Sequence, residues 1–115
     1  MRKYANVLVE GDSMEPTYSS GDWLMAKWGG FGLRTKWWQL GSRVKVGDVI
    51  VIEREEQPGI FYVKRISEIN PIEYKVFVLS DNDSGTDSRT WGWLPGFYMK
   101  AKVVSRVKKA KQKKS

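Results

Sequence analysis

The sequence predicts a compact, single-domain all-β protein, and three observations support this fold class. Apolar runs follow Gly-Asp pairs at 21–22 and 47–48, the second run is rich in β-branched residues, and such pairs favour tight turns between strands. No stretch keeps the 3.6-residue period of a long helix. A length of 115 residues suits one modest core rather than two. We therefore expect a β-sheet or β-barrel without large helices.

The expected strands follow one another at short intervals along residues 1–107, which form the predicted domain. They cover residues 5–9, 23–28, 49–53, 60–66, 74–79 and 102–107. Residues 108–115 are expected to be a basic, disordered tail, because 106–115 carry six positive charges and no negative charge. The alternative roles of this run are attraction to an anionic membrane surface and non-specific contact with nucleic acid.

Composition excludes several kinds of catalysis. The chain has no Cys and no His, so it cannot contain a Ser-His-Asp triad, a Cys-His pair, or a metal site built on thiolates or imidazoles. Any nucleophilic chemistry must use another base, and lysine is the main alternative. We expect no metal and no other cofactor.

A second set of expectations concerns location. No stretch approaches the roughly 20 apolar residues of a membrane span, and the first apolar run is too short for a signal peptide. We expect a cytoplasmic protein, at most peripheral to the inner face of the membrane. Residues 29–43 are rich in Gly and Trp. Their Trp37 and Trp38 either cap the barrel or form a patch for a membrane or a protein partner.

The strongest local signal is the segment Gly-Asp-Ser-Met-Glu-Pro-Thr at 11–17. A serine that follows a glycine turn, with a proline three residues later, is held on a constrained backbone. This favours Ser13 as an exposed nucleophile whose own amide contributes to an oxyanion hole. On composition alone, a polar turn is the simpler interpretation, because a serine is inert without a base.

Lys64 is the candidate base. In a strand over 60–66, Ile60, Tyr62, Lys64 and Ile66 share one face, and these neighbours would desolvate the ammonium and lower its pKa. Periodicity does not choose between Lys64 and Arg65 on the opposite face. Chemistry does, because arginine cannot be deprotonated in proteins. The alternative is a lysine that extends to solvent from a strand edge.

The acidic segment at 80–89 is the third signal. It is typical of a turn-rich loop with Asx caps and an Asp–Arg pair. Its acidic residues partly follow calcium-loop spacing, but the glycine and the closing glutamate of an EF-hand are not in place, so we expect no metal there.

Together these segments resemble the type I signal peptidases and their small relatives, serine proteases with a Ser/Lys dyad. The family motif Ser-Met-x-Pro-Thr stands intact at 13–17. The family's Gly-Asp pair followed by a strand matches residues 47–51, and its Lys-Arg pair matches residues 64–65. The last motif, Gly-Asp-Asn followed by Asp-Ser-Arg, is matched except that Ser80 replaces the glycine. The structural residues that the resemblance implies there are Asp81, Asn82, Asp87, Ser88 and Arg89.

The resemblance implies that Ser13 is the nucleophile and Lys64 the general base, and the chain departs from the pattern at two supporting positions. Gly11 stands where many members have an oxyanion-hole serine, so the hole would depend on the Ser13 amide, with Met14 as adjacent support. The loop of the last motif is one residue shorter than usual. In the family, a serine of this motif orients the lysine. Here that role could fall to Ser84 or Thr86, or be lost.

We also expect a compact form without the family's usual membrane anchor and second β-domain. This compact form is similar to the subgroup that matures nickel-type superoxide dismutases, which implies removal of a short N-terminal leader from a precursor protein. The alternatives are general processing of exported proteins, a self-cleaving repressor-type domain, and a non-catalytic relative. A basic, aromatic β-barrel that binds single-stranded nucleic acid is the alternative outside the family.

Overall fold

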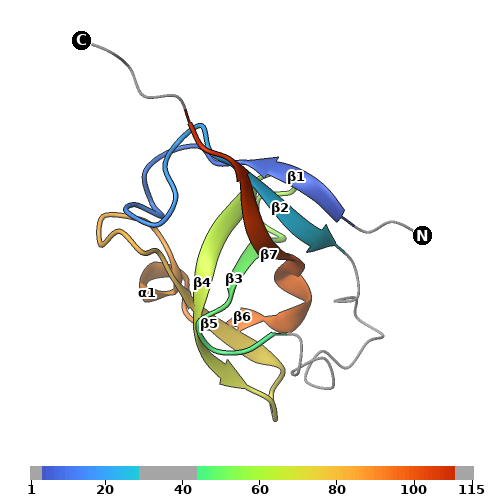
Figure 1. Ribbon diagram of the computed structural model, residues 1–115. Helices are drawn as coiled ribbons and strands as arrows, with labels where there is room; N and C mark the ends of the chain where they lie inside the picture. The colour runs from blue at the N-terminus through green and yellow to red at the C-terminus, as the bar shows by residue number, and fades with distance from the viewer. Residues whose placement is uncertain (1–3, 29–43, 111–115) are drawn as a thin grey trace.

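The structure is a computed structural model that describes residues 4–28 and 44–110. Within them, seven strands form one antiparallel sheet in the order β1-β2-β7-β3-β4-β5-β6 (Figure 1). The strands are β1 Tyr4–Leu8, β2 Trp23–Trp28, β3 Val49–Glu53, β4 Phe61–Asn70, β5 Lys75–Leu79, β6 Leu94–Pro95 and β7 Met99–Lys108. A four-residue helix α1, Ser88–Trp91, and a 3-10 turn η2, Gly96–Tyr98, precede and follow β6. The prediction of an all-β, single-domain fold is confirmed.

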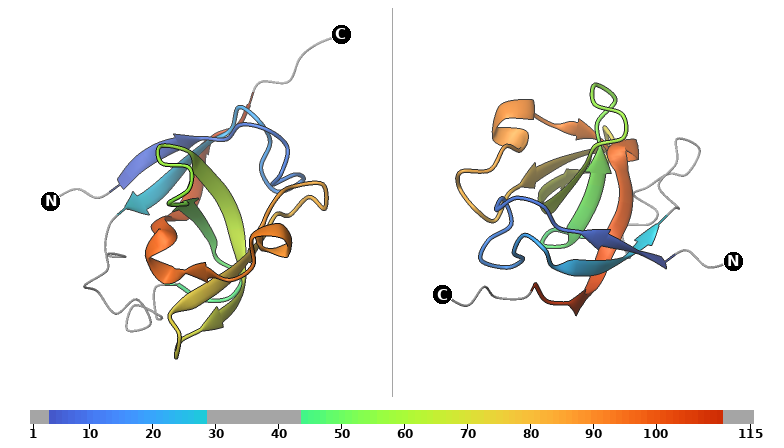
Figure 2. Two further views of the ribbon diagram at one scale, coloured as in Figure 1. Left: turned by 180° about the vertical axis from the view of Figure 1, so that it is seen from behind. Right: turned by 90° about the horizontal axis from the view of Figure 1, so that it is seen from above.

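The sheet is strongly curled rather than flat (Figure 2). The ten-residue strand β7 joins its two parts, because its first half pairs with β3 while its second half pairs with β2. Register shifts interrupt both pairings, two of them between β2 and β7. Such irregularities bend a strand and increase its twist. As a result, β1 returns toward β4, although three strands separate the two in the sheet.

The hydrophobic core lies on both faces of β3, and this explains the unbroken apolar run Val-Ile-Val-Ile at 49–52. All four residues are buried. Ile50 and Ile52 belong to one cluster of buried side chains, whereas Val49 and Val51 belong to another. A central strand covered on both faces has no solvent side and therefore needs no alternating polar residues.

The end of β7 is ordered further than the sequence indicates. The strand runs to Lys108, and the amide of Ala110 donates to the carboxylate of Asp22 at 2.7 Å. Asp22 is fully buried and also accepts from Arg106 and from the Ser19 amide. Residues 106–110 therefore pack against the loop that links β1 to β2. The expected Trp37 and Trp38 patch, and tail residues 111–115, lie outside the described residues.

Over residues 4–28 and 44–110, no helix has the length and apolar content needed to span a membrane.

Candidate active site

A groove of about 530 Å³ runs between β1 and the start of β4. Residues from β1 and the turn after it form one wall, and residues 59–63 form the other. Ser13 and Met14, the first two residues of the Ser-Met-x-Pro-Thr motif, also line the groove. The curl of the sheet therefore creates a concave site whose two walls are strand edges.

Ser13 lies in the turn that follows β1. Gly11 has φ +81, a left-handed conformation that favours glycine, and Ser13 itself is half-buried. Met14 is only 1% exposed and packs into the cluster that contains Leu24 and Val51. The buried methionine thus fixes the backbone next to Ser13, while Ser13 faces the groove.

Lys64 is the largest fully buried side chain among the described residues, at 2% exposure. Its Nζ donates a hydrogen bond to Ser80 Oγ at 2.9 Å and lies 5.6 Å and 5.8 Å from the ring centres of Tyr62 and Trp91. Burial lowers the pKa of Lys64; the charge of Asp87 opposes this shift, and the charge of Arg89 adds to it. The site therefore favours a neutral amine more than solvent does.

Gly85 lies against both Ser13 and Ser80. A Cβ added to Gly85 would lie 2.9 Å from Ser13 Cβ and 2.3 Å from Ser80 Oγ. Ser13 Cβ and Ser80 Oγ are therefore no further apart than the sum of these two distances. Ser13, which lines the groove, therefore lies in one cluster with Ser80 and Lys64.

The loop after β5 is hydrogen-bonded to the turn that contains Ser13. The Asn82 amide donates to the Ser13 carbonyl at 2.8 Å, and its side chain donates to the Asp12 carbonyl at 2.9 Å. Asp81 accepts two hydrogen bonds from Arg65, each 2.8 Å, and a third from Thr17 at 2.6 Å. The Arg65 bonds hold the pKa of Asp81 below its usual range, although burial opposes the shift. These contacts fix the strand of Lys64 relative to the turn of Ser13.

A family model described as signal peptidase, peptidase S26, matches residues 1–70, which is more than half of the chain. The chain belongs to this family. It is thus a signal peptidase-like serine peptidase with a protein substrate. The matched residues include the Ser13 motif and the Lys64-Arg65 pair. No curated protein matches the chain.

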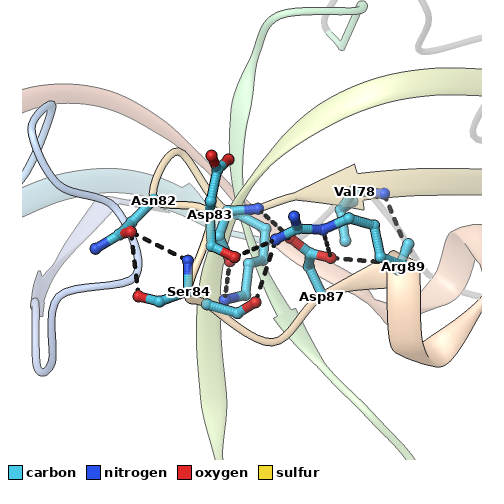
Figure 3. A network of polar contacts seen from close by, with 10 residues as sticks. Val78, Asn82, Asp83, Ser84, Asp87 and Arg89 are labelled. Carbon is cyan, nitrogen blue, oxygen red and sulfur yellow. Dashed lines mark hydrogen bonds and ion pairs between the residues drawn. The ribbon is translucent and has the colours of Figure 1, made fainter.

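A second network of hydrogen bonds, centred on Asp87 and Arg89, lies next to Ser80 (Figure 3). Asp87 is fully buried, caps α1, and accepts from the Ser80 amide at 2.6 Å and from Arg89 Nε at 3.0 Å. Burial opposes ionisation, but the bonds from Arg89 and from the Ser80 amide lower the pKa of Asp87 to about 2. Ser88 Oγ accepts from the Val78 amide, which joins α1 to β5. Asp87 thereby fixes the backbone of Ser80.

The expected partners of Lys64 need correction. Ser84 and Thr86 are exposed, and the Ser84 hydroxyl bonds to Asn82 (Figure 3). The structure places Ser80 beside Lys64 instead, because β5 pairs with β4 and ends next to it. The signal that could have identified Ser80 is its place in the last motif, where it replaces the family glycine.

Within residues 4–28 and 44–110, no group of three or more acidic side chains is arranged to hold a metal ion. The acidic residues of the last motif instead cap backbone amides and pair with Arg65 and Arg89.

Proposed function

We propose that this peptidase cuts N-terminal leaders from precursor proteins with Ser13 as nucleophile and Lys64 as general base. The observation that carries the proposal is the burial of Lys64 in a cluster with Ser80 and with Ser13, which lines the groove. A buried, aromatic-lined lysine with a lowered pKa is a costly feature in a small domain. Such groups cluster where proton transfer is needed.

The mechanism is acyl transfer. Neutral Lys64 accepts the Ser13 Oγ proton, Oγ attacks the scissile carbonyl carbon, and the Ser13 amide donates to the resulting oxyanion. The intermediate then expels the leaving amine, which takes the proton from the Lys64 ammonium. Water, deprotonated by Lys64, hydrolyses the acyl-enzyme and restores the free hydroxyl. Because burial lowers the pKa of Lys64, more of the lysine is neutral at a given pH than in solvent.

The groove suits an extended peptide. β1 is the edge strand of the sheet, and β4 pairs with β5 only from Arg65 onward, so the backbone of Phe61–Lys64 has a second edge that β5 does not cover. Main-chain pairing with such edges holds a peptide irrespective of its sequence. Apolar Val7, Met14 and Val63 contribute to the lining, which favours uncharged side chains next to the scissile bond, and the family resemblance implies that these are small.

For the substrate we propose the precursor of a nickel-type superoxide dismutase, processed in the cytoplasm, with any membrane contact peripheral. The support is the resemblance of this chain to that subgroup in the order of its motifs. Co-expression with a leader-bearing precursor tests it, because wild type should remove the leader and Ser13→Ala should not. Cleavage of an exported preprotein instead would assign a general processing role.

The dyad is tested with internally quenched peptides that carry alanine at positions one and three before the scissile bond, the small-residue pattern of leader cleavage sites. Ser13→Ala and Lys64→Met should each lower kcat at least about a thousandfold while keeping a wild-type circular dichroism spectrum. Ser105→Ala and Lys75→Met are matched controls on β7 and β5 and should retain activity. Near-normal turnover by Ser13→Ala would refute the assignment.

A further inference from the structure

The hydroxyl of Ser80 and the missing side chain of Gly85 occupy the same small space. A Cβ on Gly85 would lie 2.3 Å from Ser80 Oγ, 2.6 Å from Ser80 Cβ and 2.9 Å from Ser13 Cβ. These distances are shorter than real Cβ contacts allow. The backbone of Gly85 is not in the left-handed region, so its conformation alone would accept another residue. Glycine is therefore required there for space.

We propose that Ser80 is the residue that positions Lys64 for proton transfer, and that Gly85 serves to leave room for the Ser80 hydroxyl. The hydroxyl can come from position 80 or from position 85, but not from both. This inference rests on the proposed Ser13–Lys64 dyad and names the residue that orients its base.

The direction of the hydrogen bond is what makes Ser80 a positioning residue. A neutral lysine has two N–H groups and one lone pair, and the lone pair must face the Ser13 proton. Donation from Lys64 Nζ to Ser80 Oγ uses one N–H and restricts rotation of the amine. Ser80 is itself fixed, because it is only 8% exposed and its amide donates to Asp87. Lys64 is thus held by a residue whose own position is fixed.

The space beside Gly85 is also close enough to Ser80 Oγ for a serine at position 85 to supply the hydroxyl instead. An oxygen one bond beyond a Cβ at position 85 can reach the region that Ser80 Oγ fills, because only 2.3 Å separate that Cβ from Oγ. In wild type this space is occupied, so Gly85→Ser displaces the loop. When Ser80 is replaced by glycine, both of its conflicting atoms are removed. The remaining contact, with Ser13 Cβ at 2.9 Å, still requires a shift of the loop.

Four variants test the exchange with the quenched peptides described above. Ser80→Ala should lower kcat about tenfold to a hundredfold with little change in KM, because it removes the acceptor of a buried amine. Gly85→Ser alone should be at least as slow. The double variant Ser80→Gly with Gly85→Ser should be faster than Ser80→Ala and faster than Gly85→Ser. Its matched control, Ser80→Gly with Gly85→Ala, adds the Cβ without the oxygen and should not recover.

A second measurement does not depend on turnover. In a Ser13→Ala background, the titration of Lys64 is followed by NMR of ¹³C-labelled lysine. Ser80→Ala should lower the pKa of Lys64, because the ammonium loses a charge-assisted hydrogen bond while Asp87 and Arg89, the charged groups acting on Lys64, stay in place. A purely structural role for Ser80 would slow turnover without this shift.

The proposal is overturned if Ser80→Ala retains kcat within twofold of wild type, if it leaves the Lys64 titration unchanged, or if the serine-exchanged double variant is no faster than its alanine control. These outcomes differ from failure of the dyad itself. If Ser13→Ala or Lys64→Met remains active, the proposed function fails, whatever the Ser80 variants do.

Discussion

Asp81→Asn is the sharpest test of how the two halves of the site are held together. Asp81 accepts three hydrogen bonds, two from Arg65 on β4 and one from Thr17 beyond the nucleophile turn. Its side chain is 14% exposed, whereas that of Arg65 is 36% exposed, so solvent weakens the ion pair. We assign about 1 kcal/mol to the Arg65 pair and about 1 kcal/mol to the Thr17 bond.

Asp81→Asn keeps the shape but loses the charge, so we expect a loss of about 2 kcal/mol in the free energy of unfolding. Urea denaturation measures it as a lower midpoint at constant slope. Asp83→Asn is the matched control, since Asp83 is exposed in the same loop and uses only its backbone carbonyl to bind Arg89. The reasoning is refuted if Asp81→Asn costs less than about 0.5 kcal/mol, the range of ordinary surface changes.

Four further predictions follow from burial and charge. Met14→Ala should cost about 3 kcal/mol in urea titrations, because it opens a cavity at a side chain that is 1% exposed. Truncation after residue 108 removes the Ala110 amide from buried Asp22 and should lower Tm, whereas truncation after residue 110 should not. The folded protein lowers the pKa of Asp87 to about 2, so ionised Asp87 contributes roughly 2 kcal/mol to the free energy of unfolding above about pH 5. This contribution is lost as the pH falls toward 2. Asp87→Asn should therefore flatten that part of the acid denaturation curve. Lys64→Met should raise Tm at neutral pH, because a buried amine whose pKa is lowered on folding destabilises the folded protein at pH values below the usual lysine pKa, and an unchanged or lower Tm contradicts this.

The sequence predicted most of the sheet, because strand periodicity and Gly-Asp turns are local signals. Alternation along 60–66 placed Lys64 and Ile66 on one face and Arg65 on the other, and the structure buries Lys64 and Ile66, but alternation alone did not identify the buried face. The two-residue strand β6 was not predicted, since it is too short to produce a pattern. The extension of β4 to Asn70 past a register shift was missed for a similar reason, because such an irregularity breaks the alternation.

What the sequence did not predict depends on tertiary contacts. Ser80 lies 16 residues from Lys64 in the chain, and only the pairing of β4 with β5 brings them together. The need for Gly85 is steric and arises from side chains of two other segments. Likewise, the run of positive charge after β7 gives no sign that Ala110 binds a carboxylate buried beyond β1. Local patterns predicted the candidate pair Ser13 and Lys64 but not the residues that contact them.

The most direct test of the central claim is to trap the acyl-enzyme. Wild-type protein is mixed with excess alanine-containing peptide, quenched in acid within the first turnover, digested and analysed by mass spectrometry. Our account predicts the acyl fragment of the peptide attached to Ser13, and none in Ser13→Ala. An adduct on another residue, or none under conditions where Ser13→Ala still cleaves the peptide, would contradict it.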